Sequence, residues 1–173
     1  MWEARIAESD QPQDTGFAVD WFENRLNEVK AEVDNLMTQF KLSEALKVIY
    51  SLIWDDFCSW YLEWVKPGFE QPIEKAVYDK TVGFFEELMQ LLHPFMPFVT
   101  EEIYHLLKDN KDDLTVKLQQ APGNLHPAIL QQADLLKKVI TAVRESKNKI
   151  QLKPKKKSKL FLQKEHEFGY KKM

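Results

Sequence analysis

The sequence predicts an all-α, antiparallel helical bundle with a small C-terminal α/β appendage, and three observations lead to this prediction. Apolar residues recur at three- and four-residue spacing through most of the 173 residues, which is typical of amphipathic helices. The breaks between these stretches are short and several carry Pro or Gly, which suits helices that pack as antiparallel neighbours. Near the C-terminus the apolar period changes to two, as in a β-strand.

The apolar residues at three- and four-residue spacing fall into five predicted helices. We expect them at residues 17–40, 43–66, 72–93, 97–108 and 128–149. The second ends at Pro67 and Gly68, because proline cannot continue a helix and glycine often follows its last residue.

The junction between the third and fourth helices is unusually apolar for a connector. Pro94 lacks an N–H group, so the third helix should stop near His93, and Pro97 suits a first helical turn. Between and beside the prolines lie Phe95, Met96 and Phe98. We therefore expect this connector to turn under the bundle and close its end.

Three regions follow from this pattern. Residues 1–16 form an irregular lead-in, residues 17–126 the bundle, and residues 127–173 a basic helix plus a strand. A short extended segment is expected at 114–118, and the C-terminal strand at 158–163. A single strand is not stable by itself, so it would belong to a larger α/β element.

Composition excludes several classes of protein. One cysteine, Cys58, permits no internal disulfide and no cysteine-based zinc site, and we expect it in the core. Five glycines argue against a glycine-rich nucleotide loop. No uncharged apolar run approaches ~20 residues, so no membrane span is expected. The N-terminus does not resemble a signal peptide, which favours a cytoplasmic protein.

No residues form a convincing catalytic or metal centre. The paired carboxylates are adjacent in sequence and point about 100° apart on a helix, so they are expected on solvated surfaces or at caps. The pairs are Asp55/Asp56, Glu86/Glu87 and Glu101/Glu102. The four histidines lack metal-ligand spacing, and His93 is expected to bond a free carbonyl at a helix end. We expect no catalytic residue and no metal site.

Charge is distributed unevenly along the chain. Residues 1–136 hold 11 Lys/Arg and 24 Asp/Glu, whereas residues 137–173 hold 13 Lys/Arg and 3 Asp/Glu. The basic segment fits either a phosphate backbone or a solvated surface. Aromatic side chains crowd the end of the second helix beside Lys66. They would suit the stacking of unpaired bases if they are exposed, and simple core packing if they are not.

Two stretches resemble a known family. Residues 54–67 (WDDFCSWYLEWVKP) and 91–104 (LLHPFMPFVTEEIY) are similar to signature segments of the anticodon-binding domain of class I aminoacyl-tRNA synthetases. The form of the first stretch is most similar to the valine-specific group. Residues 141–144, with the segment that leads to Pro154, also resemble the junction that follows this domain there. The resemblance covers most of residues 17–163.

The resemblance implies a fragment that binds tRNA. The parent enzyme would attach valine to tRNA with ATP and Mg²⁺ and hydrolyse mischarged tRNA in other domains. This chain lacks those domains and should be inactive alone, with no cofactor of its own. Its partners would be the anticodon stem-loop and the rest of the synthetase chain, in a monomer. The implied tRNA-binding residues are Arg25, Tyr61, Trp64, Lys66, Phe69 and Arg144.

Two alternatives remain from the sequence. The exposed aromatics could serve a helical protein–protein interaction module instead. The domain could also come from a related synthetase of the isoleucyl or leucyl type. A domain that binds tRNA should discriminate between anticodons, whereas a protein–protein interaction module should not.

Overall fold

The computed structural model describes residues 6–7, 15–68, 70–107 and 112–151. Helices dominate this part of the chain, which confirms the predicted all-α bundle. The elements in order are β1 (Ile6–Ala7), α1 (Gly16–Thr38), α2 (Leu42–Ser51), the π-helix η2 (Leu52–Tyr61), α3 (Leu62–Val65), β2 (Ile73–Glu74), α4 (Lys75–Leu92), α5 (Pro97–Leu107), the 3₁₀-helix η3 (Leu114–Val116) and α6 (Pro127–Lys149).

The chain divides into two compact units, Met1–Ala133 and Asp134–Met173. The predicted strand at 158–163 lies outside the described residues. Among the residues that are described, no helix is both long and apolar enough to cross a membrane.

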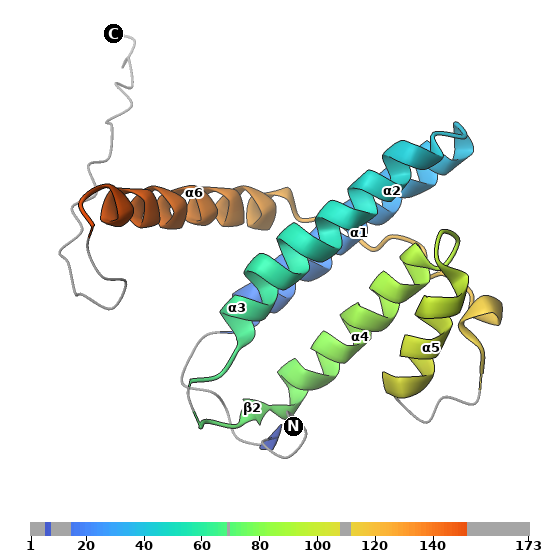
Figure 1. Ribbon diagram of the computed structural model, residues 1–173, viewed down its shortest axis with the longest axis horizontal. Helices are drawn as coiled ribbons and strands as arrows, with labels where there is room; N and C mark the ends of the chain where they lie inside the picture. The colour runs from blue at the N-terminus through green and yellow to red at the C-terminus, as the bar shows by residue number, and fades with distance from the viewer. Residues whose placement is uncertain (1–5, 8–14, 69, 108–111, 152–173) are drawn as a thin grey trace, which may run out of the picture. The chain divides into compact units, whose positions relative to one another are not determined.

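The first unit is built on α1, which runs beside a continuous rod formed by α2, η2 and α3 (Figure 1). The chain reverses between them at Phe40, which has a left-handed backbone with φ 58°. The Lys41 N–H bonds to the Leu36 carbonyl there, and the Phe40 N–H bonds to the Met37 carbonyl. This arrangement satisfies carbonyls at the end of α1, although glycine is the residue that usually occupies the left-handed position.

The predicted helix 43–66 is present as a rod over residues 42–65, but its middle is a π-helix. The Leu62 N–H bonds to the carbonyl of Phe57, five residues back instead of four. Aromatic side chains of this segment differ in burial. Phe57 and Tyr61 are buried, whereas Trp54 is exposed. π-helical segments are rare and are frequent at functional sites.

Phe22 lies at the centre of the core, with none of its side chain exposed. Its ring centroid lies 5.2 Å from Phe57, 4.9 Å from Tyr61 and 5.1 Å from Phe84. These contacts join α1, η2 and α4. The surrounding buried aliphatic side chains include Leu26, Val29, Ile49, Leu52, Val65 and Leu88.

Two asparagines of α1 form hydrogen bonds with the loop that precedes α6. Asn24 accepts a hydrogen bond from the His126 N–H at 2.7 Å, and Asn27 accepts one from the Gly123 N–H at 3.0 Å. The loop before α6 is thereby tied to α1 through its backbone, and Ile129 and Leu130 at the start of α6 pack against the core.

The prolines act as predicted at the junction of α4 and α5. Helix α4 ends at Leu92, and α5 begins at Pro97. The predicted closure of the bundle by the connector is wrong in part. Phe95 packs against the core, but Met96 is 46% and Phe98 is 89% exposed. The apolar connector is therefore partly a surface feature.

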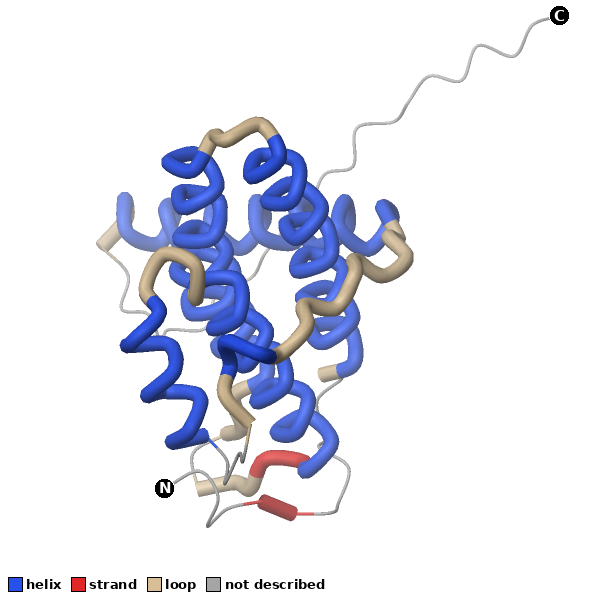
Figure 2. The backbone as a smooth tube through the Cα atoms, turned by 90° about the vertical axis from the view of Figure 1, so that its right-hand side faces the viewer, coloured by secondary structure: helices blue, strands red, loops and turns tan. Residues whose placement is uncertain are grey.

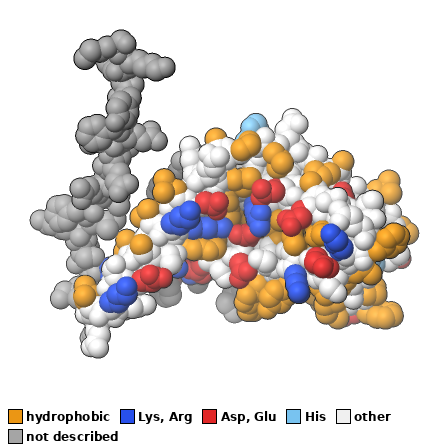
Figure 3. All heavy atoms as spheres, turned by 90° about the horizontal axis from the view of Figure 1, so that it is seen from above, with side chains coloured by type: hydrophobic (Ala, Val, Ile, Leu, Met, Phe, Trp, Pro, Cys, Tyr) orange, Lys and Arg blue, Asp and Glu red, His pale blue; other side chains and the backbone are white. Residues whose placement is uncertain are grey.

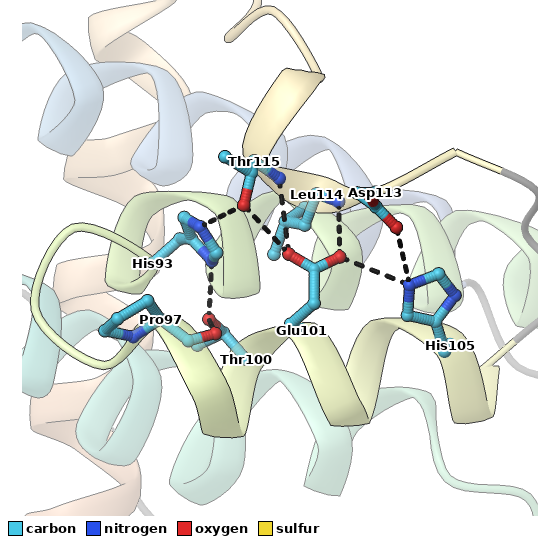
Figure 4. Close-up of polar contacts among 8 residues, drawn as sticks. All are labelled: His93, Pro97, Thr100, Glu101, His105, Asp113, Leu114 and Thr115. Carbon is cyan, nitrogen blue, oxygen red and sulfur yellow. Dashed lines mark hydrogen bonds and ion pairs between the residues drawn. The ribbon is translucent and has the colours of Figure 1, made fainter.

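Residues 114–116 form a 3₁₀-helix, so the predicted extended segment at 114–118 is wrong. Glu101 of α5 accounts for the difference, because its carboxylate accepts the Leu114 N–H at 2.6 Å and the Thr115 N–H at 3.3 Å. His93 lies between two hydroxyls, with Nδ1 2.8 Å from Thr100 Oγ1 and Nε2 3.1 Å from Thr115 Oγ1 (Figure 4). The predicted bond from His93 to a carbonyl is replaced by this bridge.

The clamp formed by Glu101 predicts a pH dependence of stability. Burial acts to raise the pKa of this carboxyl, but hydrogen bonds from Leu114 and Thr115 and the nearby His93 lower it overall. A carboxyl whose pKa is lower in the folded than in the unfolded protein stabilises the fold. This stability is fully present at pH values above the unfolded-state pKa of about 4.3, and it is lost as the pH falls through the folded-state pKa. We expect Glu101→Gln to lose less stability than the parent protein on acidification.

Urea midpoints measured between neutral pH and pH values below the ordinary carboxyl range test this expectation. Glu102→Gln, an exposed neighbour, is the matched control. Parallel curves for the parent protein and Glu101→Gln would contradict the clamp.

The lead-in is not irregular throughout. Ile6 and Ala7 pair in parallel with Ile73 and Glu74, and the two short strands lie side by side in Figure 2. Ile6 also packs against the core. The pairing connects the chain before α1 to the start of α4.

Candidate functional site

Arg25, a predicted RNA contact, takes part in ion pairs within the bundle. Its Nε lies 2.8 Å from Asp56 Oδ2, and its Nη1 lies 2.5 Å from Glu28 Oε2. Burial acts to lower the pKa of Arg25, but the bonds to Asp56 and Glu28 raise it overall. Asp56 is only 7% exposed, so the prediction that this residue is solvated surface is wrong. Arg25 therefore links α1 to η2.

Tyr61, another predicted RNA contact, is a core residue. None of its side chain is exposed, so no base can stack on its ring in this structure. Its hydroxyl lies 2.8 Å from Thr81 Oγ1, and Thr81 donates to the Val77 carbonyl, so Tyr61 is the donor to Thr81. Burial raises the pKa of Tyr61 to about 12, against the opposing effect of Thr81.

The remaining predicted contacts near the end of the rod differ in accessibility. Trp64 is half-buried, and its ring packs 4.8 Å from Trp21 and 5.6 Å from Trp60. Lys66 is exposed and forms an ion pair with Glu63 at 2.8 Å. Phe69 lies outside the described residues. Of these positions, Lys66 alone presents an exposed cation to solvent.

An exposed aromatic pair lies elsewhere on the rod. Tyr50 is 62% and Trp54 is 60% exposed, and their rings stack 6.4 Å apart with an interplanar angle of 17°. Exposed Lys47 precedes Tyr50 by three residues, so the two are neighbours on the surface of α2. Helical spacing alone predicts that Tyr50 lies on the buried side of the helix at 43–66, whereas the structure exposes it. We call Lys47, Tyr50 and Trp54 the aromatic platform.

Arg144, the last predicted contact, is exposed on α6. Other basic residues of the same helix are partly or fully exposed, namely Lys137, Lys138, Lys147 and Lys149. On the face drawn in Figure 3, basic and acidic side chains are interspersed and do not form a single basic band.

Cys58, predicted in the core, is exposed on η2. Burial of part of the side chain raises the pKa of this thiol. The thiol is therefore no candidate nucleophile, since reactive cysteines have a lowered pKa.

Residues 20–162 match the family described as the anticodon-binding domain of tRNA ligase. The chain belongs to this family. The match includes α1, the rod, the junction of α4 and α5, and α6, so it covers both the aromatic platform and the basic helix.

The similar curated proteins are valine–tRNA ligases. One from Porphyromonas gingivalis is 47% identical over 137 residues, which cover 78% of this chain and 16% of that protein. Another from Phocaeicola vulgatus is 44% identical over 145 residues, covering 83% and 16%. A third, from Aquifex aeolicus, is 30% identical over 167 residues, covering 86% and 14%. This chain thus spans about 16% of the length of the first two relatives and matches their anticodon-binding region.

Proposed function

We propose that this domain holds the anticodon stem-loop of valine tRNA for a synthetase that attaches valine to that tRNA. The family match over residues 20–162, together with relatives named valine–tRNA ligase, is the observation that carries the proposal. The domain itself supplies binding. Aminoacylation, with ATP and Mg²⁺, and the editing of mischarged tRNA would reside in other parts of the parent protein, which we propose to be cytoplasmic and monomeric.

Unpaired bases of the anticodon loop are the chemistry that this domain would recognise. The deep major groove of A-form RNA is closed to side chains, so proteins read RNA sequence mainly in loops, with bases stacked on aromatic rings. The aromatic platform offers two exposed rings and an adjacent ammonium group. It replaces buried Tyr61 as the proposed stacking site.

Electrostatics favour a contact that depends strongly on salt. Residues 1–136 carry a net charge of −13 from 11 Lys/Arg and 24 Asp/Glu, and residues 137–173 carry +10 from 13 Lys/Arg and 3 Asp/Glu. The basic residues near the C-terminus, Arg144 among them, would therefore supply most phosphate contacts. Each neutralised phosphate releases counterions, so affinity should fall as salt rises.

Binding to two anticodon stem-loops tests the proposed function. One stem-loop carries a valine anticodon, and the other differs only at the middle base. We expect tighter binding of the valine form, measured by fluorescence anisotropy of labelled RNA at moderate salt. Equal, salt-sensitive binding of both would mean that this domain contacts only the backbone, and absence of binding would favour a protein–protein interaction module.

The aromatic platform leads to a separate prediction for the same assay. Alanine replacement of Trp54 or Tyr50 should weaken stem-loop binding by about 1–3 kcal/mol for each stacked base that is lost. The control is Phe98→Ala, which removes an even more exposed aromatic ring from α5. Unchanged affinity in both platform variants would exclude the platform from the RNA contact.

A further inference from the structure

Helix α5 and the loop after it bring together three side chains that the RNA-binding proposal does not use. Glu101 and His105 are four residues apart on α5, and Asp113 immediately precedes η3. His105 Nε2 lies 3.3 Å from Glu101 Oε1 and 3.3 Å from Asp113 Oδ1 (Figure 4). The three potential ligand atoms all lie within 4.8 Å of one another. We call these residues the α5 triad.

The spacing of these atoms fits a small divalent ion. Zinc binds imidazole nitrogen and carboxylate oxygen at about 2.0–2.2 Å, which in a tetrahedron puts neighbouring ligand atoms about 3.3–3.6 Å apart. Both separations from His105 have that length. The third pair would close by a rotation of the Asp113 side chain, which is 69% exposed. One imidazole with two carboxylates suits zinc and similar transition ions better than magnesium.

The surroundings of Glu101 hold its carboxylate in place. Leu114 N–H donates to Oε1, while the N–H and hydroxyl of Thr115 both donate to Oε2. These bonds fix the orientation of the group, as the outer hydrogen bonds of metal ligands commonly do. The same bonds favour the ionised carboxylate, which is the form that binds a cation.

A cavity of about 620 Å³ opens beside the α5 triad. It is lined by the triad and by His93, Phe98 and Leu106, among others. The cavity gives an ion a route from solvent and leaves room for water as a further ligand. A site with three protein ligands and an open position follows the pattern of accessible zinc sites and not that of closed structural ones.

We propose that Glu101, His105 and Asp113 bind a divalent transition-metal ion of the zinc type, with water completing the coordination. The ion would join α5 to the segment before η3 and so reinforce the contact that the Glu101 clamp already makes. The proposal adds a metal site to a domain whose proposed function is RNA binding, and it does not depend on that function. Without an ion, the same geometry is a close contact of His105 Nε2 with two carboxylates.

Direct titration with Zn²⁺ distinguishes a metal site from an ion-free contact of the same three side chains. The full chain would carry Cys58→Ala, which removes the exposed thiol as a competing ligand. Calorimetry at neutral pH should give one bound Zn²⁺ per chain, and Co²⁺ should give the intense visible bands of a low-coordinate site. We expect His105→Gln and Asp113→Asn each to lower Zn²⁺ affinity at least tenfold.

Matched controls keep the interpretation specific. Glu102→Gln changes another residue that lines the cavity. His126→Gln removes a histidine elsewhere in the chain. Both variants should leave Zn²⁺ affinity unchanged. Zn²⁺ should raise the melting temperature of the parent protein and of these controls, but not that of the two ligand variants. Circular dichroism checks that every variant keeps the helical fold.

Two outcomes would overturn the proposal. Absence of saturable Zn²⁺ binding would leave the α5 triad as a contact between three side chains and no metal site. Binding that survives in both His105→Gln and Asp113→Asn would locate the ion at other residues. A Mg²⁺ titration should show no competition with Zn²⁺, because imidazole nitrogen is a poor ligand for magnesium.

Discussion

Replacement of Phe22 by alanine is expected to destabilise the bundle by about 3–5 kcal/mol. The ring is fully buried and touches aromatic side chains of η2 and α4, so its loss leaves a cavity where three elements meet. Small domains are stable by only about 5–15 kcal/mol, so this variant should unfold at much lower urea. Urea denaturation followed by circular dichroism measures the change.

Phe98→Ala is the control for the Phe22 variant. Phe98 is 89% exposed, so its removal should change stability by less than about 0.5 kcal/mol. If the two phenylalanine variants had equal midpoints, the assignment of Phe22 to the centre of the core would be wrong.

The second large effect is expected at the ion pair between α1 and α4. Lys30 is only 3% exposed and donates a hydrogen bond to Glu87, whose side chain is 30% exposed. Glu87→Ala would leave a buried ammonium group without this partner, so we expect a loss of about 2–4 kcal/mol. Lys30→Met should cost less, because it removes the buried charge and leaves Glu87 in contact with water.

A neighbouring pair supplies the matched control. Glu23 and Lys80 join the same two helices with the same separation in sequence, and their atoms lie 3.1 Å apart. Both side chains are about half exposed, so Lys80→Ala should cost less than about 1 kcal/mol. Equal losses for Glu87→Ala and Lys80→Ala would show that burial does not strengthen the inner pair.

The helices were predictable because their causes are local. Apolar spacing placed each of the five main helices within three residues of its observed ends, and Pro94 and Pro97 fixed the junction of α4 and α5. The 3₁₀-helix at 114–116 depends on Glu101, which lies 13 residues earlier in the chain. Alternation within 114–118 carries no information about that contact, so the segment was predicted as extended.

The candidate RNA-binding surface was less predictable than the fold. A constant helical period counts Tyr50 among the apolar positions of residues 43–66 and leaves Tyr61 open to either interpretation, whereas in the structure Tyr50 is exposed and Tyr61 is buried. Similarly, the pairing of Arg25 with Asp56 joins residues 31 positions apart. The α5 triad was missed because its third member follows the helix and lies outside any helical spacing.

The π-helix also determines which changes the rod can tolerate. Its buried positions include Asp56 as well as Leu52 and Phe57, and the last two are five residues apart. In an α-helix, with about 100° per residue, five steps would put these side chains about 140° apart instead of on one face. Deleting one residue between them would relax the rod toward α-helical geometry. Substitutions of exposed residues there would leave the orientation of the buried side chains unchanged. We therefore expect the rod to tolerate such substitutions better than a change in the number of residues.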